Sequence, residues 1–160
     1  MIQLAFYLGT KRENPQHARL LDRLICWWTE SRFSHVEFIE GYHGAGAWAT
    51  CWAASQRDRK VRPTRIDVKN GRWVVVTVPR ADYHRLLKHF QETKGTRYGY
   101  LGALSHALPA WPGLLRRAAR AIDARRRYCS QHIAIGLGLE KTHLTPGDLY
   151  AALVGGGSTP

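Results

Sequence analysis

The sequence predicts an α+β domain in which an antiparallel sheet packs against helices, and three observations support this fold class. The expected elements run in the order strand, helix, strands, helices, without the regular alternation of a parallel βαβ fold. Residues 33–40 alternate apolar and polar side chains, as a half-buried strand does. Asn70-Gly71 lies between two β-rich segments and is typical of a hairpin turn.

The length of the chain suits one domain. It has 160 residues, of which 44% are apolar, which is enough for one hydrophobic core and short for two typical domains. We therefore expect a single domain over residues 1–154. The glycine-rich end of the chain, residues 155–160, is expected to be a flexible tail.

Turn-forming residues separate the expected strands. The first apolar segment ends at Gly9, and a glycine-rich turn (residues 41–46) and a basic loop (residues 56–65) follow the next two strands. We expect the Asn70-Gly71 turn to pair the strands on its two sides directly with each other. The expected strands are residues 2–8, 33–40, 47–54, 66–68 and 73–78.

Capping residues mark the expected helices. Asn14-Pro15 combines an N-cap residue with a proline that the first helical turn accepts, and Thr145-Pro146 does the same near the end of the chain. Asp82 can cap a helix that stops at Gly95. The expected helices are residues 15–30, 82–94, 114–127, 129–137 and one that begins at residue 145.

The charge balance indicates an anionic partner. Lys and Arg number 24 against 12 Asp and Glu, which gives a formal net charge of +12. Such a surface attracts nucleic acid, an anionic cell-wall polymer or a membrane surface. No apolar segment has the length of a transmembrane span, and the first residues lack the pattern of a secretory leader. The expected location of the chain as encoded is therefore the cytoplasm.

The cysteines indicate a reducing compartment. Cys26, Cys51 and Cys129 are too few for a disulfide scaffold and form no C-x-x-C pair for a zinc knuckle. Because their number is odd, at least one thiol is free in a monomer. Cys26 and Cys51 lie in apolar, aromatic segments and are expected in the core.

Cys129 is the candidate nucleophile. It follows a run of arginines and begins an apolar helix, where the positive end of the helix dipole favours the thiolate. The alternative at this point is a helix residue that only packs in the core. His35, near the start of a strand, is suited to supply the base that a thiolate mechanism needs. Its alternative is a histidine exposed on an edge strand.

Three segments together resemble a known family. Ser34-His35-Val36-Glu37 on a strand, Tyr98 to Gly102, and Tyr128-Cys129-Ser130 at a helix start are similar to the circularly permuted papain-like amidases, relatives of the NlpC-type cell-wall endopeptidases. The resemblance covers nearly the whole chain, and implies a permuted papain-like fold and a cysteine hydrolase that cleaves an amide bond, as in peptidoglycan peptides. Similar compact proteins are often encoded by phages and prophages.

The resemblance also implies roles for individual residues. Cys129 would be the nucleophile, and His35 the general base and then the general acid. Tyr98 matches a tyrosine that lines the pocket and helps to hold the oxyanion, together with the backbone N–H of Cys129. Gln131 departs from the family, because many relatives have glutamate there.

The residue that orients the imidazole ring is left open. In relatives it is usually on the strand after the histidine, where Thr50 is the only hydroxyl residue of segment 47–54. Glu37 shares a strand face with His35 and can instead contribute to the cleft. If neither residue orients His35, a degenerate, non-catalytic member of the family would fit the sequence equally well.

The other histidines are not expected in the site. His132 shares a helix face with Cys129, but pairs within one helix rarely align for proton transfer, so packing or solvent contact is expected. His84 and His89 lie in a basic segment and are expected to be solvated. His17, His43, His106 and His143 are scattered, so no metal-ligand spacing emerges, and we expect neither a metal nor a cofactor.

The basic segments support rival functions. Residues 56–72 and 116–127 hold much of the excess charge and have aromatic residues nearby, but no known nucleic-acid motif accompanies them. They are equally suited to bring an anionic polymer or phospholipid to a cleft, and residues 114–124 to lie on a membrane surface. The alternatives to a peptidase are a non-catalytic binding or phage morphogenesis protein, and a lipid-amide hydrolase or acyltransferase.

Overall fold

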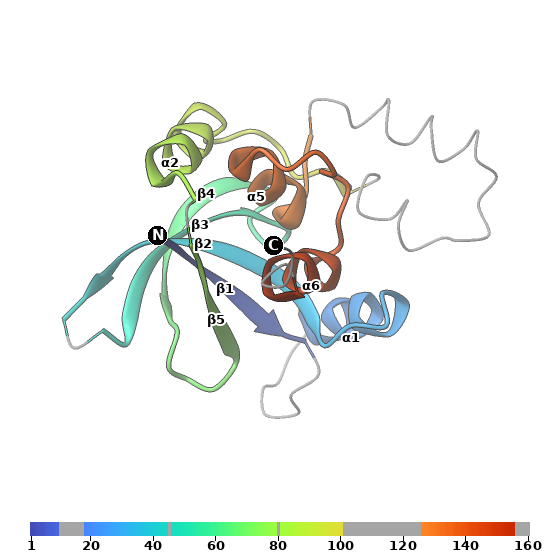
Figure 1. Cartoon of the computed structure of the whole chain (residues 1–160). Helices are drawn as coiled ribbons and strands as arrows, with labels where there is room; N and C mark the ends of the chain where they lie inside the picture. Colours follow the sequence, from blue (N-terminus) through green and yellow to red (C-terminus); the bar gives the residue numbers. More distant parts are fainter. Residues whose placement is uncertain (10–17, 45, 80, 101–125, 156–160) are drawn as a thin grey trace.

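The computed structural model describes residues 1–9, 18–44, 46–79, 81–100 and 126–155 (Figure 1). Within these residues the fold is α+β, with four helices and one antiparallel sheet whose strand order is β4-β3-β2-β1-β5. The strands are β1 (Ile2–Leu8), β2 (Phe33–His43), β3 (Trp48–Ser55), β4 (Lys60–Asp67) and β5 (Trp73–Val78). The helices are α1 (Ala18–Trp28), α2 (Tyr83–Glu92), α5 (Cys129–Leu137) and α6 (Pro146–Gly155). The predicted fold class is therefore confirmed at this level.

The main core lies between the sheet and three helices. Alternate residues of β1, such as Leu4 and Phe6, are fully buried, and they meet Phe90 of α2, Ile133 of α5 and Leu149 of α6 in one apolar cluster. Burying a side chain of this size stabilises the fold by about 1.5–3 kcal/mol. Helices α2 and α5 lie side by side, and α5 contacts β2 and β3 (Figure 1). This packing fixes the start of α5 against the sheet.

The expected hairpin between β4 and β5 is not formed. The turn itself is present, because Asn70 Oδ1 accepts a hydrogen bond from the backbone N–H of Arg72 and Gly71 has a φ of 75°. However, β5 pairs with β1, while β4 pairs with β3 at the opposite edge of the sheet. The apolar β1 thereby gains a second neighbour, and the ring of Trp73 packs against that of Tyr7.

The expected basic loop over residues 56–65 is also wrong in part. Residues 60–65 belong to β4, which forms the edge strand beside β3. Charged side chains are compatible with this edge position, where β4 has β3 on one side and a short contact with residues 95–97 on the other. The expected glycine-rich turn is shorter than predicted too, since β2 continues to His43.

The caps of two helices are confirmed. The Asp82 side chain accepts from the backbone N–H of Arg85 at the start of α2. Thr145 and Asp148 each accept a hydrogen bond from the other's backbone N–H at the start of α6, in a reciprocal capping arrangement. Gly138 ends α5 in the left-handed conformation, with a φ of 76°.

Two predicted segments extend beyond the residues that the structure describes. Of the basic helix expected over residues 114–127, residues 114–125 lie outside the described residues, but Arg127 is not helical. It forms a parallel β-bridge with Tyr98 instead. Of the expected tail, Gly155 is the last residue of α6 and residues 156–160 lie outside the described part. None of the described helices is long and apolar enough to cross a membrane.

Candidate active site

Cys129 is the first residue of α5 and lies against β2. Its residue is only 3% exposed, and Tyr128 precedes it as the N-cap in an extended conformation. Burial raises the pKa of the Cys129 thiol. The charge and hydrogen bond of His35, and hydrogen bonds from the backbone N–H groups of Val36 and Ser130, lower this pKa by more than burial raises it. The net pKa is therefore below its ordinary value. The arrangement favours a thiolate at Cys129.

His35 is the second member of this group. It lies near the start of β2, pairs with Tyr7 of β1, and has a side chain that is 20% exposed. Burial alone would lower its pKa, but the charge and hydrogen bond of Cys129 and the interactions of Glu37 raise it to about 10. The two shifts together favour a thiolate at Cys129 paired with an imidazolium at His35.

Glu37 completes a chain of three interacting side chains. Its Oε1 lies 3.2 Å from Nε2 of His35, because residues two apart on a strand project from the same face. With Nε2 held by Glu37, Nδ1 is the ring nitrogen left to exchange a proton with Cys129. Glu37 is 3% exposed, so its carboxylate is kept from bulk water.

Thr50, the other residue considered for orienting His35, is elsewhere. It pairs with Gly41 on the distal half of β2, and its hydroxyl lies 2.7 Å from Nε2 of His43. The structure therefore brings Glu37, and not Thr50, to His35. A bulge between Ile39 and Gly41 separates the two regions of the strand.

Tyr98 lies close to the cysteine segment in the chain fold. Tyr98 forms a β-bridge with Arg127, which is two residues before Cys129 in the sequence, and this bridge holds Tyr98 near the start of α5. Tyr98 is buried in the same apolar cluster as Tyr128 and Cys129. Its ring packs on Tyr100, with centroids 4.9 Å apart. The predicted proximity of the Tyr98 segment to the start of α5 is thus present.

His132 is directed to α2 and not to the nucleophile. It is 1% exposed, stacks on Phe90, and has its Nδ1 3.1 Å from Nε2 of His89. Burial, and then the charges of His89 and Arg127, lowers its pKa to about 3. The expectation of packing for His132 holds, whereas His89 is half-buried against it and is not simply a solvated residue.

The other two cysteines are buried, as expected. Cys26 packs against Gly9, and burial followed by the charge of Asp22 raises the pKa of its thiol to about 11. Cys51 is fully buried in a small apolar cluster with Ala5 and Ile39, on the face of the sheet away from the main core, and burial raises its pKa strongly. Neither thiol has the environment of Cys129, and all three are free.

Sequence reasoning missed two charged residues near this site. Arg62 of β4 has Nη1 3.6 Å from Oε1 of Glu37. Asp22 of α1 feels the charge of His35, although burial raises its pKa. The alternation of β4 would have indicated Arg62 only if residues 60–65 had been recognised as a strand, and no local pattern indicated Asp22.

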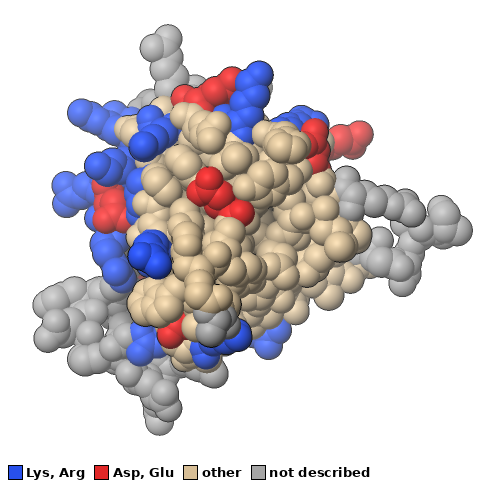
Figure 2. Space-filling view, turned by 90° about the vertical axis from the view of Figure 1, so that its left-hand side faces the viewer, with Lys and Arg blue, Asp and Glu red and all other residues tan. Residues whose placement is uncertain are grey.

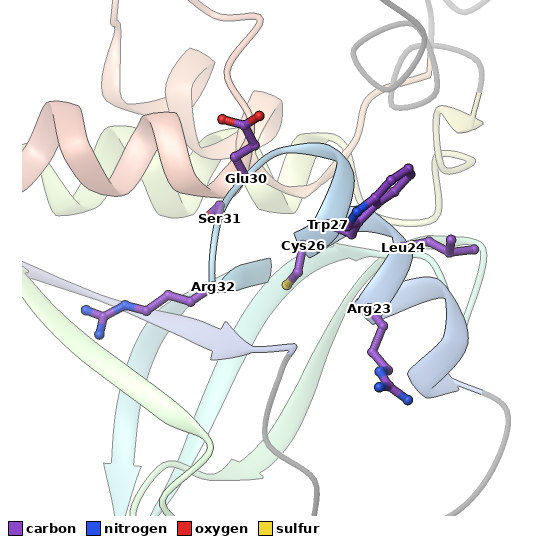
Figure 3. Close-up of a pocket in the computed structure, with 7 residues that line it drawn as sticks. All are labelled: Arg23, Leu24, Cys26, Trp27, Glu30, Ser31 and Arg32. Atoms are coloured by element: carbon purple, nitrogen blue, oxygen red, sulfur yellow. The ribbon is translucent and has the colours of Figure 1, made fainter.

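The structure also has an open groove outside this group. It has a volume of about 600 Å³ and is lined by α1 and the turn before β2 (Figure 3). Trp27 on its rim is 76% exposed. Its lining residues are Arg23, Leu24, Cys26, Trp27, Glu30, Ser31 and Arg32, so it includes none of the three residues described above. Over the described ranges, no three His, Cys, Asp or Glu side chains gather in a group that could hold a metal ion.

The chain matches no protein-family model, no curated protein and no solved structure. The similarity to permuted papain-like amidases therefore stays a prediction from the motifs of the sequence. Independently of these motifs, the structure has a chain of interactions from Cys129 through His35 to Glu37.

Proposed function

We propose that this protein is a cysteine hydrolase of the permuted papain-like type that cleaves an amide bond in peptidoglycan peptides. The observation that supports the proposal is the contact of Cys129 with His35, and of His35 with the buried carboxylate of Glu37. A nucleophile, a base and a group that orients the base are the three parts that such a mechanism needs.

The residues supply each step of acyl transfer. The Cys129 thiolate attacks the carbonyl carbon, and the oxygen that becomes negative is stabilised by the backbone N–H of Cys129 at the start of α5 and by Tyr98. The His35 imidazolium gives its proton to the departing amine, and the C–N bond breaks. The neutral His35 then takes a proton from water, whose hydroxide releases the acid and restores the thiolate and imidazolium.

Glu37 makes the imidazolium available for these steps. Its negative charge stabilises the protonated ring, and its contact with Nε2 fixes the ring orientation. The non-catalytic alternative rested on the absence of a carboxylate beside His35, so the position of Glu37 supports the catalytic proposal over it.

The substrate class follows from charge and from the resemblance. The chain has a net charge of +12, and Figure 2 shows Lys and Arg side chains gathered along the margin of one face, around a broad surface with few charges. Cell walls are rich in anionic groups, which a basic surface concentrates near it. The resemblance supplies the peptide part of the substrate.

Alkylation of Cys129 as a function of pH tests the nucleophile. The rate with iodoacetamide, followed at each cysteine by peptide mass spectrometry, should stay high well below the ordinary thiol pKa of about 8.5, because the thiolate is paired with His35. In His35→Ala the rate at Cys129 should return to the ordinary profile. Cys26, with a raised pKa, serves as the internal control.

Hydrolysis of purified peptidoglycan tests the activity. Wild-type protein should release new amino groups, and Cys129→Ala should release none while keeping the circular dichroism spectrum, whereas Cys51→Ala should remain active. Turnover by Cys129→Ala would refute the proposal. An ordinary alkylation profile without turnover would favour the non-catalytic binding protein, and release of fatty acid from N-acyl amides instead would favour the lipid-amide hydrolase.

A further inference from the structure

We propose that Arg62 is a positioning residue of this site, which acts on His35 through Glu37 and is itself held by Asp58. The inference rests on the proposed function, because it concerns the same three side chains. It extends the chain of interactions from β2 across the sheet to β4, a strand that carries none of the residues identified by motif.

The sheet provides a path from Arg62 to Glu37. Strand β3 lies between β2 and β4, and Ala53 of β3 is the direct partner of Arg62. On the other side of β2, Ala5 of β1 is the direct partner of Glu37. Because the intervening side chain at position 53 is a single methyl group, the long Arg62 side chain can extend over it to reach the carboxylate.

Glu37 needs this cation. It is 3% exposed, and, within the part of the chain that the structure describes, its Oε2 has no hydrogen-bond partner. Burying a carboxylate costs free energy unless nearby cations compensate its charge, and Arg62 supplies part of that compensation. Arg62, with Nη1 3.6 Å from Oε1, and His35, at 3.2 Å, are the two cations beside it among the described residues.

Asp58 fixes the guanidinium in place. Its Oδ2 accepts a hydrogen bond of 2.5 Å from Nε of Arg62 and another of 2.7 Å from the Ser55 hydroxyl. The backbone N–H of Asp58 donates in turn to the Ser55 oxygen. The bonds from Arg62 and Ser55 hold the pKa of Asp58 below its ordinary value. One edge of Arg62 is thus anchored to the turn after β3, and Nη1 is left directed to Glu37.

The test compares Arg62→Met with wild-type protein in the alkylation experiment at Cys129. Removal of the cation should move the lower limb of the pH profile, the pH range over which the alkylation rate rises, up by about one pH unit. The reason is that a positive charge beside the chain of Cys129, His35 and Glu37 is lost. Arg62→Lys keeps the charge and should move it less. Arg65→Met removes a charge from an exposed position of the same strand and is the matched control, with no expected shift.

Each outcome separates the inference from the proposed function. If wild-type protein shows the low-pH limb and Arg62→Met shows the same limb, Arg62 has no positioning role and the hydrolase proposal stands. If wild-type Cys129 has an ordinary profile, both fail. Should Arg62→Met not fold, Asp58→Asn tests the same chain: it should give a smaller shift in the same direction, and an unchanged profile would overturn the inference.

Discussion

At the scale of single residues, the carboxylate of Glu37 is the group on which the chemistry of His35 depends. Glu37→Gln keeps the size and a hydrogen-bonding end but removes the negative charge that favours the imidazolium. We expect peptidoglycan hydrolysis to fall by up to about 10²–10⁴-fold, the range that general acid–base catalysis contributes, because His35 depends on Glu37 for this role. Initial rates of amine release, measured on protein with an unchanged circular dichroism spectrum, check this.

Thr50→Val is the natural control for Glu37→Gln. Both residues were suited to orient the ring on sequence grounds, but the Thr50 hydroxyl contacts His43 and should be dispensable for turnover. A large loss in Thr50→Val with full activity in Glu37→Gln would reverse the assignment.

The sequence predicted a contact between residues that are close in the chain, and missed a contact between residues that only the pairing of strands brings together. The two-residue period of a strand already placed Glu37 on the face of His35, and the contact between them follows from it. Arg62 comes to the same carboxylate through the pairing of three strands, and no motif reports such pairing.

At the scale of elements, the packing of α5 against α2 determines where Cys129 lies. Gly136 of α5 faces α2 so closely that an added Cβ would overlap Cδ1 of Leu86, which is fully buried. We expect Gly136→Ala to destabilise the protein, because overpacking costs about 1–3 kcal/mol while the helix propensity of alanine returns about 1 kcal/mol. Urea denaturation measures the net change.

Gly155→Ala is the matched control for Gly136→Ala. Gly155 is also helical, at the end of α6, but an added Cβ there would meet no atom within 4 Å. Its midpoint in urea should stay the same or rise slightly. Equal stability of the two variants would show that α2 and α5 are not packed as closely as described.

The elements themselves were largely predictable, and their pairing was not. Caps such as Asp82 and Thr145 are local signals, so α2 and α6 begin where the sequence indicated. The Asn70-Gly71 pattern correctly predicted a turn, but which strand β5 joins depends on the free edge of β1, a property of the whole sheet. The permuted papain-like topology accordingly stays a prediction.

At the scale of the whole molecule, a buried histidine, His132, and its half-buried neighbour His89 link stability to pH. Burial lowers the pKa of His132 to about 3 and also lowers that of His89, with Arg127 acting in the same direction. In the unfolded chain both histidines have a pKa of about 6.5. Below that pH the unfolded state binds more protons than the folded state, so their contribution is complete above about pH 6.5 and is lost as the pH falls.

The free energy of unfolding should therefore decrease as the pH falls from about 7 to about 5. His132 should account for about 2 kcal/mol of this decrease. His132→Asn keeps a polar atom near the position of Nδ1 but cannot be protonated, so its stability should depend less on pH than that of wild-type protein, whatever its absolute value. His84→Asn, at an exposed position on α2, should leave the dependence unchanged. Urea denaturation of the three proteins at both pH values measures this, and parallel losses in wild-type protein and His132→Asn would contradict a neutral, buried His132.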